Sequence, residues 1–332
     1  MTCSGVTCAW LRRRARPTTS LSTAVASTVS DWWIVHLFGV DVPDHKVVQC
    51  ELYELVEELS TEHTATHFVH AWRLPPALRS ASRFLKPPSI DEPHPRISTD
   101  PRFYPYFQNC LGAIDGSHVT ITATPGIAAP FRNRKGTLSH NIMIACDFDL
   151  RITFISCGWE GSATDARVLQ SAMMTGFRVP EGKFYLVDGG YANTQSFLAP
   201  YRGVRYHLKE FGHGRARPQN HMELFNHRHA ILRNHVERSL GILKKRFPIL
   251  HVGTLHAIEN QVKLPAAAAV LHNIIKMHNG DETWLDNQPN NIAPNDFVDL
   301  PNGDENNYGS NGLGNTLRDE IAMQMWQAYH PE

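Results

Sequence analysis

The chain has 332 residues, of which 42% are hydrophobic and 19% charged, and its 32 basic residues balance 32 acidic ones. This length allows one large domain or two ordinary ones, and either can bury a substantial core. No apolar run approaches the ~20 residues needed to cross a bilayer, so no membrane span is expected. The six cysteines form no CxxC pair, which argues against a disulfide framework and favours a reducing compartment.

The charges are unevenly distributed along the chain. Residues 201–250 contain 11 lysines and arginines against three glutamates, a net charge of 11 − 3 = +8. From residue 281 onward the sign reverses and acidic residues dominate. A basic block beside an acidic tail is typical of a protein that binds a polyanion. The best candidates for phosphate contacts are Lys244, Lys245 and Arg246.

The amino-terminal third carries no chemical motif. Residues 1–30 lack acidic side chains and are interpreted as a basic, disordered arm, with a transit peptide or a mispredicted first exon as the alternatives. Residues 31–72 form a small helical region, since apolar residues recur at helical spacing over residues 46–59. Prolines are dense in residues 73–104, and this segment is predicted to be an extended connector that marks a domain boundary.

The pattern then changes to that of a mixed α/β domain over residues 105–280. Strands are predicted over residues 111–122, 140–147, 151–157, 183–187 and 203–208. The second and third of these form a hairpin with a tight turn at residues 148–150.

Helices are predicted between and after these strands. The first opens at Gly161 and Ser162, and the second begins at the cap Asn220 and ends before Pro248. A third covers residues 259–278, and the acidic residues 281–332 are expected to be a largely mobile tail.

Three acidic residues stand in contexts that suit a divalent metal. Asp115 lies within an apolar strand, Asp188 follows another, and Glu237 lies on the long helix among arginines. Carboxylates from strand ends and a helix are typical ligands of a hard cation such as Mg²⁺ or Mn²⁺. Each also has a structural interpretation: Asp115 and Asp188 as turn residues before glycine, and Glu237 as the partner of Arg233 in a surface ion pair.

Further acids have two interpretations each. Asp165, at the start of a helix, either complements the helix dipole or adds a fourth ligand to the same metal site. The pair Asp147 and Asp149 fits the DxD pattern of phosphatases or sugar-nucleotide enzymes, but a hairpin turn explains it without chemistry.

Six stretches of this sequence, in order from about residue 100 to 276, together resemble the PIF/Harbinger superfamily of DDE transposases and the Harbinger-derived nucleases. They are PYFQNCLGAIDGSHV, FRNRKGTLSHNIMIACDFDLRITFISCGWEGSATDARVLQ, KFYLVDGGYAN, PYRGVRYHLKEF, RPQNHMELFNHRHAILRNHVERSLGILKKRFPIL and AVLHNII.

The resemblance implies an α/β fold of the RNase H-like type, a mixed sheet flanked by helices. It also implies that Asp115, Asp188 and Glu237 are catalytic and that these three and Asp165 bind a divalent metal. The amino-terminal third departs from the family, because residues 1–95 show no clear helix-turn-helix.

These observations predict a nuclear, divalent-metal-dependent endonuclease of transposase origin that cleaves DNA by a DDE two-metal mechanism. A separate DNA-binding protein is a further expected partner, since the chain shows no DNA-reading motif of its own. The alternative is a domesticated, non-catalytic nuclear protein that binds DNA or recruits a partner.

Overall fold

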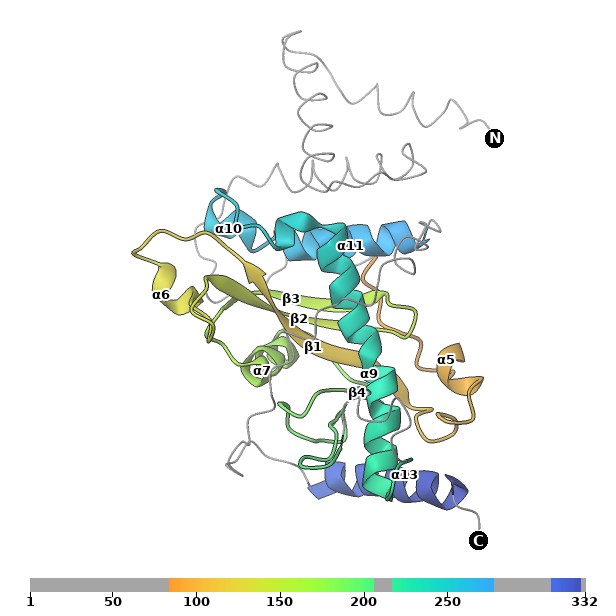
Figure 1. The fold of residues 1–332 in the computed structure, drawn as a ribbon. Helices are drawn as coiled ribbons and strands as arrows, with labels where there is room; N and C mark the ends of the chain where they lie inside the picture. The colour runs from red at the N-terminus through yellow and green to blue at the C-terminus, as the bar shows by residue number, and fades with distance from the viewer. Residues whose placement is uncertain (1–83, 206–216, 278–311, 330–332) are drawn as a thin grey trace, which may run out of the picture. The chain divides into compact units, whose positions relative to one another are not determined.

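The computed structural model describes residues 84–205, 217–277 and 312–329, and its central element is a mixed five-stranded sheet (Figure 1). The strand order is β3-β2-β1-β4-β5, in which β1 to β3 are antiparallel neighbours, while β4 and β5 run parallel to β1. The strands are β1 (Cys110–Thr120), β2 (Ser139–Cys146), β3 (Ile152–Glu160), β4 (Phe184–Leu186) and β5 (Phe197–Leu198). This arrangement with flanking helices is consistent with the predicted RNase H-like fold.

The hairpin between β2 and β3 forms as predicted. All eight residues of β2 are buried, as expected for an apolar strand in the middle of a sheet. At the turn, the Asp147 amide donates to the Arg151 carbonyl at 3.0 Å, and the Leu150 amide donates to the Asp147 carbonyl at 3.3 Å. Asp147 and Asp149 therefore occupy a tight turn, which confirms the structural interpretation of the DxD pattern.

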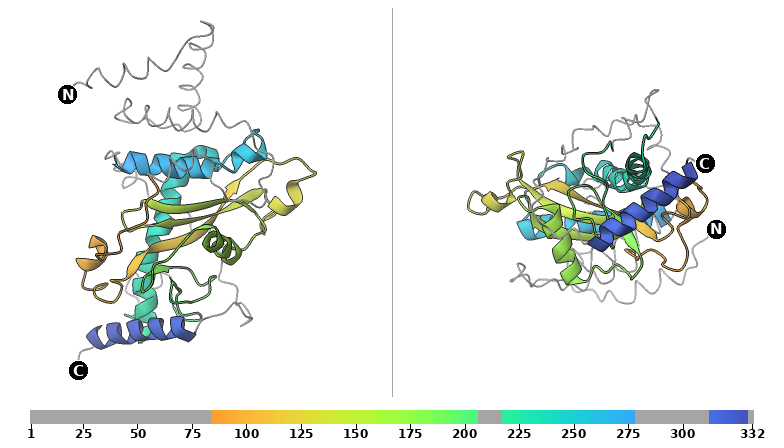
Figure 2. Two further views of the ribbon diagram at one scale, coloured as in Figure 1. Left: turned by 180° about the vertical axis from the view of Figure 1, so that it is seen from behind. Right: turned by 90° about the horizontal axis from the view of Figure 1, so that it is seen from below.

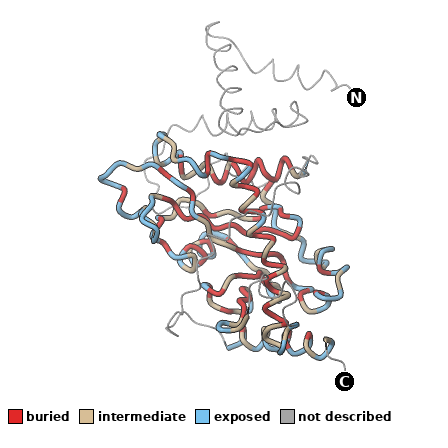
Figure 3. The backbone as a smooth tube through the Cα atoms, in the orientation of Figure 1, coloured by how far each residue is buried: buried red, intermediate tan, exposed pale blue. Residues whose placement is uncertain are grey.

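Helices cover both faces of the sheet (Figure 2). Helix α7 (Asp165–Thr175) packs on one face through Val168, Leu169 and Ala172. The long helix α9 (His221–Arg246) crosses β1 on the other face, and α11 (Leu264–Met277) packs beside it against β3. Buried residues concentrate in the strands and on the inward sides of these helices (Figure 3).

Helix α9 begins and ends where the sequence predicts. Its cap Asn220 accepts a hydrogen bond from the Glu223 amide at 2.9 Å, and Pro248 follows the last turn to start a short 3-10 helix, η1 (Pro248–Leu250). The predicted apolar face of this helix is buried along its whole length. It comprises Leu232, Val236, Leu240, Leu243 and Phe247.

Several element predictions are wrong. The strand predicted over residues 203–208 does not begin there, because residues 203–205 lie in no strand, and residues 206–208 lie outside the described residues. The fifth strand is instead β5, which lies upstream of the predicted segment and forms two residue pairs with β4. The helix predicted over residues 259–278 is two helices, α10 (Ile258–Gln261) and α11. Helix α6 (Ala128–Phe131) is not among the predicted elements.

The described part of the predicted proline-rich connector, residues 84–104, is mostly exposed but includes a few buried apolar side chains. It contains α5 (Pro95–Ser98), and Ile97 and Phe103 are fully buried. Pro95 stands at the first turn of α5, a position that suits proline because no helical hydrogen bond is lost there.

The expected mobile tail is also ordered where it is described. Residues 312–329 form α13 (Gly312–Tyr329), which packs on α9 and β5 through Ile321, Ala322 and Met325. The predicted arm (1–30) and helical region (31–72) lie outside the described residues. None of the helices in the described ranges is long and apolar enough to cross a membrane.

Candidate metal centre

Strand pairing brings Asp115 and Asp188 to neighbouring strands. Strands β1 and β4 are parallel, and Ala113 of β1 lies opposite Leu186 of β4. Asp115 and Asp188 each come two residues after these partners, so they lie near each other. The turn interpretation of Asp115 is wrong, because Asp115 and Gly116 both lie inside β1, paired with Ile144 and Met143. Asp188 follows the end of β4, where its Oδ1 accepts the Gly190 amide at 2.9 Å.

Helix α9 adds the third acid on the same face of the sheet. Arg233, which precedes Glu237 by one helical turn, donates from Nη1 to Glu237 Oε1. Its Nη2 lies 3.0 Å from Asp115 Oδ2 and 4.0 Å from Asp188 Oδ2. The predicted pair of Glu237 and Arg233 therefore exists, but it is a partly buried bridge between three carboxylates and not a surface pair.

Asp165 approaches β1 from the opposite face. Successive side chains of a strand alternate between faces, so Gly116 faces α7 where Asp115 faces α9. A Cβ added to Gly116 would lie 2.3 Å from Asp165 Oδ1, so the glycine leaves the space that this carboxylate fills. Asn141 of β2 holds the same oxygen, with its Nδ2 donating at 2.8 Å.

The electrostatics of the centre follow from its burial. Loss of solvent raises the pKa of Asp115 to about 7; Arg233 opposes this rise, and the charges of Asp188, Glu237 and Asp165 add to it. Burial also raises the pKa of Asp165, against the stabilising hydrogen bond from Asn141. Raised carboxyl pKa values are frequent at functional sites, where burial and like charges are brought together.

Two unpaired polar atoms border these acids, and sequence reasoning missed both residues. Among the described residues, Tyr191 Oη and Asn141 Oδ1 are buried without a hydrogen-bond partner. Tyr191 is 1% exposed, and burial, together with the charges of Asp165, Asp115 and Asp188, raises the pKa of its hydroxyl. Oxygen atoms of this kind, close to carboxylates of the centre, fit the ligand chemistry of Mg²⁺ or Mn²⁺. The only sequence signal for Tyr191 is its place directly after Asp188, Gly189 and Gly190.

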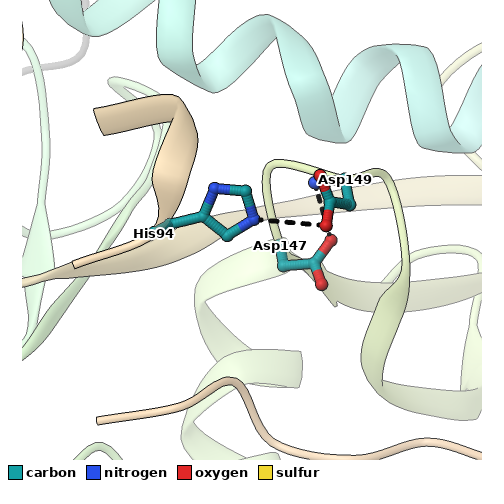
Figure 4. Close-up of side chains that lie close together, drawn as sticks. All are labelled: His94, Asp147 and Asp149. Carbon is teal, nitrogen blue, oxygen red and sulfur yellow. Dashed lines mark hydrogen bonds and ion pairs between the residues drawn. The ribbon is translucent and has the colours of Figure 1, made fainter. Parts of the chain in front are cut away.

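The acids of this centre do not form the tightest group of ligand atoms. Among the described residues, one group of three has ligand atoms that all lie within 4.8 Å of one another: His94, Asp147 and Asp149 (Figure 4). His94 Nε2 lies 3.5 Å from Asp149 Oδ2. Local structure accounts for this group, since Asp147 Oδ1 accepts the Asp149 and Arg151 amides at the hairpin, and His94 Nδ1 caps α5.

In this centre the carboxylates come from β1, from the loop after β4 and from the crossing helix α9, and oxygen ligands of this kind suit a divalent cation. Residues 114–273, about half of the chain, match the family model described as DDE superfamily endonuclease. The chain therefore contains a DDE superfamily endonuclease domain, and all four candidate acids lie within it.

Distant relatives agree with this family. The chain is 29% identical to the Rattus norvegicus protein named "Putative nuclease HARBI1", over 52% of this chain and 48% of the relative. It is 26% identical to mouse HARBI1 over 64% of this chain and 58% of the relative. It is 27% identical to Protein ALP1-like of Arabidopsis thaliana over 54% of this chain and 46% of the relative. The chain thus spans about half the length of these relatives, and no solved structure matches it.

Proposed function

We propose that this chain is a divalent-metal-dependent endonuclease that cleaves DNA phosphodiester bonds in the nucleus. One observation carries the proposal: Asp115, Asp188 and Glu237 come from three separate segments of a DDE endonuclease domain, and their carboxylates all face the guanidinium of Arg233. The single guanidinium of Arg233 offsets only part of the repulsion among three carboxylates, so the arrangement favours a further, bound cation.

Each acid has a distinct part in the proposed site. Asp115 and Asp188 would hold the ions between β1 and β4, Glu237 would complete the site from α9, and Asp165 would contribute from the α7 face. When bound, the ions would supply Lewis-acid activation of the scissile phosphate. The chain itself would fix the carboxylates and exclude water around Asp115, which is the least exposed of the three acids bridged by Arg233.

Plasmid nicking tests the proposal directly. Purified protein should nick supercoiled DNA with Mg²⁺ or Mn²⁺ and not with EDTA. Asp115→Asn and Asp188→Asn should each lower the rate by roughly a hundredfold or more, because each removes a charge that holds the catalytic ion.

The matched control is Asp149→Asn, which changes an exposed acid of the hairpin turn. This variant should nick DNA at the wild-type rate. A loss of activity would instead indicate that the metal binds at the group of His94, Asp147 and Asp149. Metal-independent DNA binding with no nicking by the wild type would instead support the alternative of a domesticated, non-catalytic DNA-binding or partner-recruiting protein.

A further inference from the structure

Arg233 occupies an unusual position for a cationic side chain. Its side chain is only 7% exposed, and its guanidinium contacts the carboxylates of Asp115, Asp188 and Glu237 together. A buried guanidinium is costly unless carboxylates neutralise it, and buried carboxylates are costly without a cation. Each side of this bridge therefore depends on the other.

The geometry of α9 enforces this arrangement. Arg233 and Glu237 are four residues apart, so they lie on the same face of the helix one turn from each other. That face crosses β1 at Asp115, and the backbone of α9 is held at both ends of the contact by the buried Leu232 and Val236. The guanidinium thus cannot leave the acids without a rearrangement of its side chain inside the core.

We propose that Arg233 is a positioning residue that competes with divalent cations for the carboxylates of Asp115, Asp188 and Glu237. This inference rests on the proposed function, since it assumes that these acids bind a metal. Arg233 Nη2 lies 3.0 Å from Asp115 Oδ2, so this oxygen can bind either the arginine or a metal ion, but not both at once. Arg233 therefore keeps the acids together and at the same time sets a threshold of metal concentration for the site.

The charge balance gives the direction of the effect. Three carboxylates contact one guanidinium, so the centre keeps an excess of negative charge that attracts a divalent ion. Removing the positive charge at a distance of a few ångströms deepens that attraction strongly in a partly buried site. Arg233→Gln should therefore bind Mn²⁺ roughly tenfold or more tightly than the wild type, while the metal-free variant should unfold at a lower temperature.

The experiment is isothermal titration of Mn²⁺ and Mg²⁺ into the full chain, with unfolding temperatures measured in parallel. The matched control is Arg238→Gln, an exposed arginine on the same helix, which should change neither quantity. If Arg233→Gln fails to fold, Arg233→Lys replaces it. Lysine keeps the charge, but a single ammonium cannot bridge three carboxylates, so metal affinity should rise by a smaller factor.

The outcomes separate this inference from the proposed function. Unchanged or weaker metal binding by the folded Arg233 variant, with a wild type that binds, overturns the competition and leaves the metal site intact. A wild type and an Arg233 variant that both fail to bind metal overturn the proposed function and this inference together. Tighter binding that Asp115→Asn abolishes supports both.

Discussion

Asp115 is the acid of the proposed centre whose pKa is shifted most. Burial raises its pKa from 3.8 to about 7, although Arg233 lies beside it. The folded chain therefore retains a proton on this carboxyl between pH 4 and 7, where the unfolded chain has released it. Stability from this group is greatest at the acidic end of that window and falls as the pH rises toward about 7.

This linkage predicts a pH-dependent difference between the wild type and Asp115→Asn. In the metal-free protein, the free energy of unfolding of the wild type relative to the variant should fall from pH 5 to pH 7 and level off above it. The asparagine does not titrate, so the difference isolates Asp115. Urea unfolding at a series of pH values in EDTA measures it, and a difference that grows with pH would contradict the raised pKa.

Gly116 separates acids on the two faces of β1, so its replacement should affect Asp165 alone. In Gly116→Ala the new Cβ would overlap Asp165 Oδ1 and force that carboxylate away. We expect the free energy of unfolding to fall by about 1–3 kcal/mol and the Mn²⁺ affinity to weaken. Gly126→Ala is the control, because nothing lies within 4 Å of a Cβ there. Equal metal binding by Gly116→Ala and the wild type would exclude Asp165 as a ligand.

The acids themselves could be predicted from the sequence, whereas the groups around them could not. Asp115, Asp188 and Glu237 each stand out within an apolar or basic context of the chain. Asn141 and Tyr191 do not, because a buried polar residue in an apolar strand and a tyrosine after two glycines are common. Their relation to the acids depends on strand register and on distant contacts, which no local pattern encodes.

At the scale of elements, α13 shows how a segment of low apparent order can belong to the fold. Arg318 lies over the Tyr201 ring at 4.0 Å from its centroid, and Asn193 Nδ2 donates to Asn315 Oδ1 at 3.0 Å. A Cβ on Gly314 would lie 2.5 Å from Thr194 Cα, so the helix backbone packs directly against the loop before β5. Helix α13 packs against α9 near its amino-terminal end, where Asn220 forms the cap.

Two methionines of α13 provide a direct test of this packing. Met325 is fully buried and Met323 is 44% exposed. Met325→Ala should lower the free energy of unfolding by about 2–5 kcal/mol, because it leaves a cavity against α9. Met323→Ala should change it by less than about 0.5 kcal/mol. Thermal or urea unfolding compares them, and equal effects would mean that α13 is not docked in solution.

Periodicity predicts the long elements and fails for the short ones. Helix α9 and strands β1 to β3 have many residues that repeat one pattern, so their existence and partners are well specified. Strand β5 has two residues, too few for any alternation to be visible. Helix α13 differs from the predicted mobile tail because overall composition does not show which few residues are buried, and here Ile321, Ala322 and Met325 pack into the fold.

At the scale of the whole molecule, the basic block is less uniform than its sequence suggests. Arg246 is buried, and its Nη1 lies 3.2 Å from His272 Nδ1, so the prediction that it contacts DNA is wrong. Lys245 is exposed, and Lys244 is partly exposed. The end of α9 thus has one cation that stabilises the junction with α11 and two that reach solvent.

DNA binding can separate these roles. A Lys244→Ala, Lys245→Ala double variant should bind non-specific duplex DNA more weakly, and its plot of log K against log salt should be shallower by roughly 0.9 for each phosphate that is no longer neutralised. Lys86→Ala, an exposed lysine outside the block, is the control. Fluorescence anisotropy over a range of salt concentrations measures the slope, and a slope equal to that of the wild type would assign both lysines to helix stability alone.

The pairing of β1 with β4 has a consequence for the folding of the protein. The acids lie on segments that are far apart in the chain, and none of them meets another until the parallel pair has closed and α9 has crossed it. Closure of such long loops is slow and comes late in folding. A nascent or partly folded chain therefore lacks the assembled group of acids, and on the proposed function it would acquire the ability to cut DNA only when folding is complete.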